Sequence, residues 1–239
     1  MFTDGSSDIL SIRVNMSKKY YEKMGSYLEE HKLYLTQEHL KRDTDFISQS
    51  LSLTKKDKCL DLQCAQGRLT IELTKRGFKI DGLDFSDYML GIARSESEQA
   101  NIDINFIKGD LNNLRLPRIY TKVALYFPDL DGINLDNFLL GVSRIMKSRG
   151  LFLYDQDNLF RIWDYLTKNS DSSFSFNPFT MELKEKRKRI GNRYYVFPEL
   201  KNKFEKAGFK IVRVYGGWTI DDGEYKYNSS RLRIIAKKD

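Results

Sequence analysis

The sequence is poor in the residues that bind zinc or form disulfide frameworks. It has two cysteines and two histidines among 239 residues. Cys59 and Cys64 stand close together without a second pair, so a metal site is not expected. Such low cysteine usage favours a reducing, cytoplasmic compartment. His31 and His39 lie outside any group of reactive residues, and we interpret them as structural or exposed.

Long apolar stretches are also missing. No run approaches about 18 consecutive apolar residues, the length that predicts a membrane-spanning helix. The first eight residues are polar and carry Asp4 and Asp8, unlike the basic and then apolar layout of a secretory signal. The composition, 41% hydrophobic and 31% charged, is ordinary for a globular protein and leaves room for a sizeable core. We therefore expect no membrane partner.

Basic residues outnumber acidic ones, and the net charge is +7. Part of the excess lies in residues 184–189 (KEKRKR), and the rest is scattered. A basic balance is compatible with a nucleic-acid partner or simply with a solvated surface. No signature of a nucleic-acid-binding module accompanies the charge, so the solvated surface is the favoured interpretation.

The sequence from residue 58 alternates short apolar runs with amphipathic stretches. The apolar runs predict strands, and apolar residues recurring every three or four positions predict helices. The expected strands are 58–63, 78–83, 104–108, 122–127 and 151–154, with helices at 67–76, 87–99 and 135–147. This order predicts a parallel sheet with helices on both faces. Before it, residues 1–57 are expected to form an N-terminal helical cap, with helices near 20–28 and 36–51.

The alternation stops at residues 159–196, which we predict to form a small antiparallel β flap inserted after the fifth strand. Apolar and polar residues alternate over 174–189, and 190–192 is a candidate hairpin turn. A helix from Pro198 and strands at 209–218 and 230–237 then complete the sheet. The predicted fold class is α/β: a Rossmann-like, doubly wound, seven-stranded sheet. Its domain would span 58–158 and 197–239.

Ligands of such sheets bind beyond the carboxyl ends of the strands. These ends carry the small-residue turn 63–68, the acidic residues Asp84 and Asp110, and the segments 126–129 and 155–158. A short strand, a tight turn, a helix and a second strand ending in a carboxylate is the arrangement of a nucleotide-type cofactor site.

Five segments resemble, in order, motifs of the class I S-adenosylmethionine-dependent methyltransferases. Residues 60–68 (LDLQCAQGR) are similar to LDxGCGxGR, and 82–90 (GLDFSDYML) to GxDxSxxML. Residues 106–111, 141–150 and the tail from 207 resemble the third motif, the segment before the fifth strand, and the end of the small-molecule branch. The resemblance covers roughly residues 20–238. It implies S-adenosylmethionine as cofactor and a small organic molecule, methylated at N or O, as acceptor.

The family implies roles at the matching positions. The backbone of 61–67 would hold the methionine part of the cofactor, Asp84 the ribose hydroxyls, and Asp110 the adenine amino group. The complete set of cofactor-binding residues implied is Asp61, Gln63, Cys64, Ala65, Gly67, Arg68, Asp84, Phe85, Met89, Asp110, Leu111 and Tyr126. The weaker acceptor-side candidates are Tyr20, Phe127 and Asp157. No general base can be assigned.

The sequence departs from the family at its first motif. Gln63 and Ala65 replace glycines that permit positive φ and let the cofactor approach the backbone. A side chain there would cost on the order of 1–3 kcal/mol in strain. Lys122 also replaces the usual aspartate of the fourth strand. A catalytically degenerate binding protein therefore stays open as an alternative. The positive net charge and the segment 184–189 keep an RNA methyltransferase or RNA-binding protein open as a second alternative, and a homodimer stays open as well.

Overall fold

The computed structural model describes residues 21, 28, 31, 35–116, 120–169, 173–185 and 191–239. Most of the predicted N-terminal cap, including Tyr20 and the helix expected near 20–28, lies outside these residues. The cap's second helix is present as α3 (Gln37–Ser50), and the Thr36 side chain accepts from the His39 N–H at its start. Threonine is a favoured N-cap residue because its hydroxyl can accept from a backbone N–H of the first helical turn.

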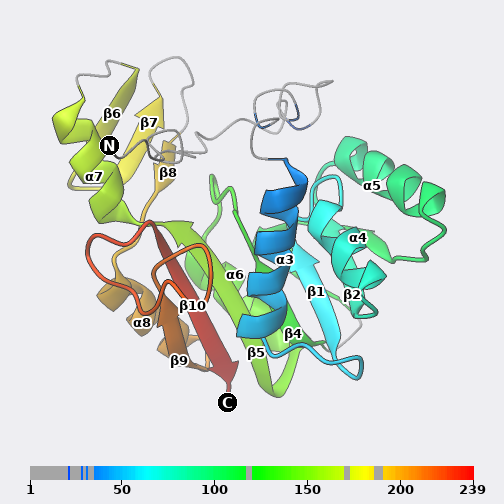
Figure 1. Cartoon of the computed structure of the whole chain (residues 1–239). Coiled ribbons are helices and arrows are strands. Elements are labelled where there is room, and N and C mark those ends of the chain that lie inside the picture. Colours follow the sequence, from blue (N-terminus) through cyan, green and yellow to red (C-terminus); the bar gives the residue numbers. More distant parts are fainter. Residues whose placement is uncertain are drawn as a thin grey trace.

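A seven-stranded sheet forms the centre of the molecule (Figure 1). Its order is β3-β2-β1-β4-β5-β10-β9. The first five strands in this order pair parallel to one another, and β10 is antiparallel to both neighbours, so β9 runs in the same direction as the first five. The strands are β1 (Lys58–Leu62), β2 (Lys79–Asp84), β3 (Phe106–Lys108), β4 (Tyr120–Leu125), β5 (Met146–Asp157), β9 (Phe209–Tyr215) and β10 (Arg231–Lys238). The predicted Rossmann-like α/β fold is thus confirmed.

Helices cover both faces of the sheet because each strand alternates its apolar side chains between them. The other helices are α4 (Arg68–Lys75), α5 (Asp87–Gln99), α6 (Leu135–Ile145), α7 (Leu159–Lys168), α8 (Phe197–Lys206) and the 3-10 turn η3 (Leu111–Asn113). On β1, Cys59 packs in the cluster with α3 and α4, whereas Leu60 packs in the cluster with α6 and α8. Strand β1 is therefore buried from both sides and lies at the centre of the core.

Strand β5 begins five residues earlier than predicted. The amphipathic pattern extends the expected helix to 147, but α6 ends at Ile145 and Met146 is already extended. The pairing of β4 with β5 shifts register after Tyr120, and Arg149 has φ +63°. A bulge of this kind adds an unpaired residue to one strand. Gly150 is required there, since a Cβ would lie 2.9 Å from two backbone oxygens.

The predicted flap is a separate three-stranded antiparallel sheet of β6 (Phe174–Asn177), β7 (Glu182–Glu185) and β8 (Gly191–Arg193). A turn at 178–181 separates β6 from β7, where the alternating pattern had indicated one continuous strand. Met181 in this turn has φ +56°. The flap packs on α7 through Leu159 and Ile162, which meet Leu183 and Tyr194. Among the described helices, none is long and apolar enough to cross a membrane.

Candidate functional site

The chain direction across the sheet reverses between β1 and β4. From β1 the chain proceeds outward to β2 and β3, and then returns to β4 and β5 on the other side. Open α/β sheets bind ligands in the crevice at such a switch point, beyond the carboxyl ends of the strands. Here that crevice lies between the turn 63–67 after β1 and the loop 126–131 after β4. We call it the switch crevice.

The turn after β1 has the backbone of a glycine-rich loop without its glycines. Gln63 has φ +55°, Ala65 has φ +48° and Gly67 has φ +75°. All three values lie in the left-handed region that favours glycine. The two non-glycine residues are therefore strained, at a cost of the order of 1–2 kcal/mol each. The sequence-based expectation that these positions demand positive φ is correct.

The side chain of Gln63 crosses the switch crevice. Its Nε2 donates to the carbonyl oxygen of Asp129 at 2.6 Å, and its Oε1 accepts from the N–H of Asp129 at 2.9 Å. The carboxamide thus joins the loop after β1 to the loop after β4 by two hydrogen bonds. We call this pair the Gln63–Asp129 clasp. Asp129 Oδ2 also accepts from the Tyr21 hydroxyl at 3.1 Å.

Asp84 ends β2 beside this turn, as predicted. Its carboxylate accepts from the N–H of Ala65 and of Ser86, each at 2.9 Å. The residue is 4% exposed, and burial raises its pKa against the effect of these backbone hydrogen bonds. Phe85 follows, with its ring edge-on to Tyr21 at 5.5 Å. The Ser86 hydroxyl donates to the Tyr21 carbonyl at 2.9 Å, so one tyrosine spans both sides of the crevice.

Asp61 lies in β1 below the turn and is 4% exposed. The Thr70 hydroxyl donates to its Oδ2 at 2.6 Å. Burial raises the pKa of Asp61 to about 7, and the nearby charge of Asp84 adds to the effect. The side chain acts in this position as a buried hydrogen-bonding group that ties β1 to α4.

This raised pKa predicts a pH-dependent stability. A carboxyl whose folded pKa exceeds its unfolded value stabilises the fold at low pH, and that stabilisation is lost as pH rises through the folded pKa. Between pH 5 and pH 7, the unfolding free energy of wild type should fall by roughly 2 kcal/mol relative to that of Asp61→Asn. This follows because one pH unit corresponds to at most about 1.4 kcal/mol for a single titrating group. Urea denaturation of both proteins at several pH values checks this. A difference that stays constant with pH would contradict it.

The remaining predicted cofactor residues are spread around the turn and η3. Cys64 and Met89 are buried, and the Met89 N–H donates to the Ser86 hydroxyl at 3.2 Å. Asp110 is exposed, and its carboxylate accepts from the Asn112 N–H at 2.9 Å at the start of η3. Leu111 is 4% exposed and packs in the core shared with α6. That Leu111 covers one face of the adenine ring of the cofactor stays a prediction.

Arg68 begins α4 directly after the turn. Its Nη2 lies 3.4 Å from Asp43 Oδ2, which comes from α3. Its Nη1 is buried and has no hydrogen-bond partner among the described residues. A buried, unpaired guanidinium nitrogen is costly and is usually completed by a ligand or water. The position therefore offers a donor at the side of the switch crevice.

A buried charge network lies behind the crevice at the ends of β4, β5 and β10. Asp155 accepts from Arg231 Nη2 at 2.8 Å, from Arg233 Nε at 3.1 Å and from the Phe127 N–H at 2.9 Å. Arg233 also donates to the Tyr126 hydroxyl at 2.6 Å, and that hydroxyl donates to Asp43 Oδ1 at 3.1 Å. Burial alone would raise the pKa of Asp155, but the two arginine charges outweigh it and lower the pKa.

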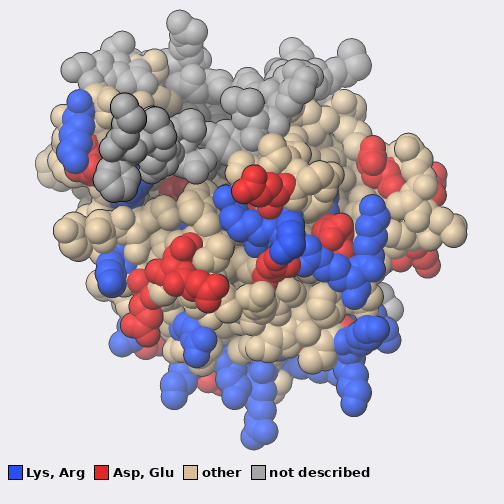
Figure 2. All heavy atoms as spheres, in the orientation of Figure 1, with Lys and Arg blue, Asp and Glu red and all other residues tan. Residues whose placement is uncertain are grey.

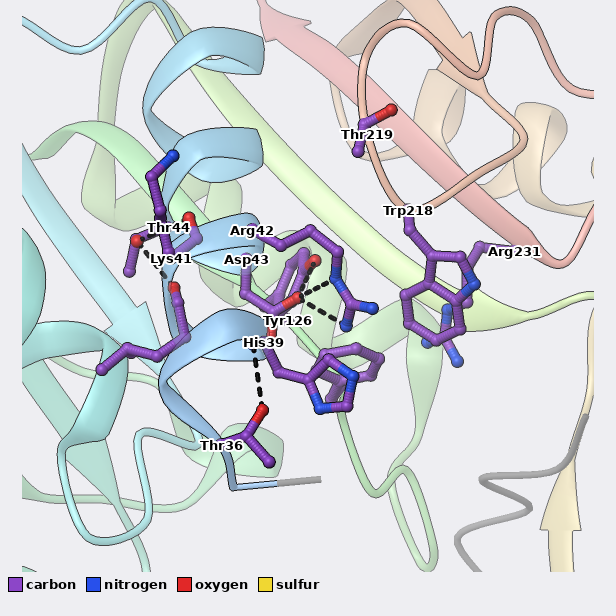
Figure 3. Close-up of polar contacts among 12 residues, drawn as sticks. Thr36, His39, Lys41, Arg42, Asp43, Thr44, Tyr126, Trp218, Thr219 and Arg231 are labelled. Carbon is purple, nitrogen blue, oxygen red and sulfur yellow. Dashed lines mark hydrogen bonds and ion pairs between the residues drawn. The ribbon is translucent and has the colours of Figure 1, made fainter. Parts of the chain in front are cut away.

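Figure 3 shows the part of this network around Asp43 and Tyr126, with Arg42, Trp218 and Arg231 beside it. The Arg42 guanidinium lies 4.5 Å from the centre of the Trp218 ring, and the Arg231 guanidinium lies 5.5 Å from the same centre. Arg42 also donates to Asp43 Oδ1 at 3.0 Å. Trp218 comes from the loop after β9, so α3 and the C-terminal strands are joined over the ends of β4 and β5.

Sequence reasoning missed Asp43, Arg231 and Arg233. Buried arginines are rare, and an apolar strand gives no reason to expect two of them inside the protein. A signal was present, however, in the paired spacing of charges. Arg231 and Arg233 are two residues apart, as are Asp155 and Asp157, and each arginine stands directly opposite one aspartate in the β5–β10 register. Opposite charges in such cross-strand pairs stabilise the pairing.

A small pocket lies between the flap and the ends of β4 and β5. Its lining residues are Phe127, Pro128, Leu130, Gln156, Asp157, Asn192, Arg193, Tyr194 and Arg231. Its volume of about 20 Å³ holds about one water molecule. Phe127 has φ +51°, a strained conformation for a residue with a side chain, and its ring centre lies 4.8 Å from the Arg231 guanidinium. Of the acceptor-side candidates, Phe127 and Asp157 are thus brought together, and Tyr20 lies outside the described residues.

The substitution of Lys122 for the family's aspartate has a local explanation. Its Nζ donates to the carbonyl oxygen of Leu51 at 2.6 Å, directly after the C-terminus of α3. A cation is favourable at the C-terminal end of a helix because the last carbonyl groups carry partial negative charge. Lys122 therefore anchors α3 on the sheet and lies away from the switch crevice. Within the described residues, no group of three or more His, Cys, Asp or Glu side chains is arranged to hold a metal.

Residues 59–150 match the family model of a methyltransferase domain. Over this region the chain is similar to class I S-adenosylmethionine-dependent methyltransferases. It is 22% identical, over 76% of its length and 84% of the relative's, to a protein of Geobacillus sp. (strain WCH70) that is named a methyltransferase. It is 27% identical, over 70% of its length and 75% of the relative's, to carboxy-S-adenosyl-L-methionine synthase of Campylobacter hominis.

Solved structures of this methyltransferase family share the fold. An S-adenosylmethionine-dependent methyltransferase from Clostridium acetobutylicum has a TM-score of 0.69 at 17% identity, covering 90% of this chain and 99% of that one. Magnesium protoporphyrin IX methyltransferase from Synechocystis, with bound S-adenosylhomocysteine, has a TM-score of 0.60 at 14% identity, covering 93% and 97%. S-adenosylmethionine is the cofactor of this methyltransferase family.

The residues of this methyltransferase domain fit the adenosine part of that cofactor. Asp84 Oδ2 accepts from the Ala65 N–H and Oδ1 accepts from the Ser86 N–H. A carboxylate has about four acceptor positions, so capacity for a diol remains. The unpaired Nη1 of Arg68 is a further donor beside the turn. The methionine end differs, because the Gln63–Asp129 clasp crosses the crevice that this part would enter.

Proposed function

We propose that this protein transfers a methyl group from S-adenosylmethionine to a nitrogen or oxygen atom of a small organic molecule. The observation that carries the proposal is the switch crevice. It combines a left-handed turn at 63, 65 and 67 with the Asp84 carboxylate at the end of the neighbouring strand. The two cysteines are buried free thiols, which supports a reducing, cytoplasmic setting.

The protein's own residues would bind and orient both reactants. When bound, the cofactor supplies a sulfonium methyl group that is open to nucleophilic attack. Asp84 would accept hydrogen bonds from the ribose hydroxyls, held in place by the N–H groups of Ala65 and Ser86. Asp110, exposed at the start of η3, would accept from the adenine amino group. Because the reactivity is the cofactor's, the protein contributes mainly alignment and exclusion of water.

The acceptor would enter between the flap and the ends of β4 and β5. Phe127 and Tyr194 provide aromatic walls there, and Asp157 provides a carboxylate that is 21% exposed and ion-paired with Arg231. Such a site suits a molecule with an apolar ring or chain and one amine or hydroxyl group. The pocket, with a volume of about 20 Å³, would hold only a small part of such a molecule.

Thermal unfolding with added S-adenosylmethionine or S-adenosylhomocysteine tests the cofactor half of this proposal. A ligand at 100 times its Kd stabilises the folded state by about 2.7 kcal/mol. At about 2–4 °C per kcal/mol for a chain of this size, Tm should rise by roughly 5–10 °C. Asp84→Ala should lose most of the shift, since it removes the acceptor for the ribose. No shift in the wild-type protein at millimolar cofactor would refute the proposal.

Transfer of a labelled methyl group tests the acceptor half. The wild-type protein is incubated with methyl-labelled S-adenosylmethionine and either a small-metabolite extract or bulk tRNA. Label in the small-molecule fraction is expected, and label in tRNA would instead support the RNA methyltransferase alternative. Most of the basic segment 184–189 that motivates that alternative lies outside the described residues.

A second candidate, a binding protein that has lost cofactor use, is favoured by one observation. The Gln63–Asp129 clasp occupies the switch crevice with two hydrogen bonds of 2.6 and 2.9 Å. If the clasp is permanent, the methionine part of the cofactor has no room. The effect of replacing Gln63 on the affinity for S-adenosylmethionine separates the methyltransferase from the binding protein.

A further inference from the structure

The amino ends of the parallel strands carry a row of lysines, at the edge of the sheet opposite the switch crevice. In the sheet register Lys79 of β2 stands opposite Lys58 of β1, and Lys122 of β4 opposite Cys59 beside it. The row continues through Leu151 of β5, which pairs with both Lys122 and Lys237 of β10. Lys237 pairs in turn with Lys210 of β9. We call this row and its neighbours the basic edge.

The basic edge extends across most of the width of the sheet. From β2 to β9 it crosses five spaces between strands, or about 24 Å at about 4.8 Å per space. Lys147 and Arg149 extend it at the start of β5, and Lys55 and Lys56 extend it in the turn before β1; all four are exposed. Figure 2 shows Lys and Arg side chains gathered along the lower rim of the molecule, where these strand starts and the C-terminus lie.

Much of this charge is not neutralised within the described residues. Lys58 lies 3.6 Å from Asp81, and Lys122 is held by the end of α3. In contrast, Lys79, Lys147, Lys210 and Lys237 are exposed, and none of them has a carboxylate partner in the described part of the chain. The carboxylates of Asp57 and Asp81 already accept hydrogen bonds from threonine and tyrosine hydroxyls, and Asp239 is exposed at the C-terminus.

Four exposed lysines on α3, β3, α7 and the flap differ, because each forms an ion pair with a nearby carboxylate. They are Lys41 with Asp45, Lys108 with Asp87, Lys168 with Asp164, and Lys184 with Glu182. The positive charges of these four lysines are thus neutralised locally, unlike those of the exposed lysines on the basic edge.

The chemistry of the edge selects the kind of partner. The large exposed apolar side chains of the described residues lie on α6, on α7, in the flap, in the middle of β9 and in the loop before β10. The edge therefore lacks the apolar groups that insert into a membrane surface. A line of flexible, fully charged lysines matches the regularly spaced phosphates of a nucleic-acid strand.

We propose that the basic edge binds the sugar–phosphate backbone of nucleic acid. Phosphate contacts carry no sequence information, so the binding is independent of base sequence. The edge and the switch crevice lie at opposite ends of β1, a strand of five residues that is about 16 Å long. Bound nucleic acid thus leaves the switch crevice open, and the inference stands whether or not the proposed methyl transfer does.

The test uses the full-length protein and a fluorescently labelled 20-nucleotide oligouridylate, with anisotropy measured from 50 to 200 mM KCl. One variant combines Lys79→Gln, Lys147→Gln, Lys210→Gln and Lys237→Gln. The control combines Lys41→Gln, Lys108→Gln, Lys168→Gln and Lys184→Gln and removes the same four charges. For a single strand, the logarithm of the binding constant should fall with the logarithm of the salt concentration, with a slope of about −0.7 per phosphate contact. The edge variant lacks four lysines, so its slope should be less steep by about 3.

At 100 mM KCl the edge variant should bind at least tenfold more weakly than wild type, and the control less than threefold. Circular dichroism melting verifies that both variants are folded. An equal loss in both variants would show a response to net charge alone and would overturn the proposal. So would absence of wild-type binding at 50 mM KCl, or binding to phosphatidylserine vesicles in place of the oligonucleotide.

Discussion

Replacing Gln63 with glycine is expected to raise the affinity for S-adenosylmethionine by about tenfold or more. The change removes the side chain that crosses the switch crevice and relieves a left-handed residue at φ +55°. A tenfold change corresponds to about 1.4 kcal/mol, which is within the strain and hydrogen-bond energy stored in the clasp. Isothermal titration calorimetry of wild type and Gln63→Gly measures the difference directly.

Ala65→Gly is the matched control for this experiment. Ala65 has the same left-handed backbone, φ +48°, but its methyl group cannot reach the loop after β4. It should change the affinity less than threefold, so that a large gain in Gln63→Gly alone identifies the clasp as the obstacle. Tight binding by wild type, unchanged in Gln63→Gly, would mean that the clasp opens freely. Binding gained only in the glycine variant would favour the second candidate, a protein that has lost cofactor use.

Asp155→Ala is expected to be the most destabilising single substitution in the site, by about 3–5 kcal/mol. Removing one partner of a buried ion pair leaves an uncompensated charge, and Asp155 serves two guanidinium groups that are 2% and 0% exposed. The whole stability of a domain is only about 5–15 kcal/mol. Urea denaturation followed by circular dichroism measures the loss of unfolding free energy.

Asp157→Ala is the control, because the Asp157 side chain is 21% exposed, whereas the Asp155 side chain is fully buried. Asp157→Ala should lower the unfolding free energy by less than half as much as Asp155→Ala does. The double variant Asp155→Ala, Arg233→Met should recover part of the loss, since it removes one of the stranded charges. If Asp155→Ala unfolds at the same urea concentration as wild type, the network does not stabilise the fold as we describe.

Most of the sheet could be predicted from the sequence because local patterns specify it. The five parallel strands each follow from an apolar run, and caps such as Ser86 and Asn134 mark where two helices begin. Where the prediction erred, a non-local effect decided the structure. Strand β5 begins at Met146 because a bulge near Arg149 allows pairing with β4, and Met146 pairs with Tyr120, which lies 26 residues earlier.

The site was only partly predictable for the same reason. Asp84 and the turn 63–67 follow from short motifs, and the structure places them together as expected. The destination of the Gln63 side chain was not predictable, since its partner Asp129 is 66 residues away. Asp43, Arg231 and Arg233 also come from segments far apart in the chain, and only their burial gives them a common role. Charged residues such as these are expected at the surface when only their residue type is known.

The position of β10 has a consequence for synthesis of the chain. Both arginines that neutralise Asp155 follow it in the sequence, by 76 and 78 residues. A growing polypeptide emerges N-terminus first. Until β10 has emerged, the polypeptide holds Asp155 without these counter-ions and leaves β5 unpaired on that side. A truncation before Arg231 should therefore yield a protein that is readily degraded by proteases.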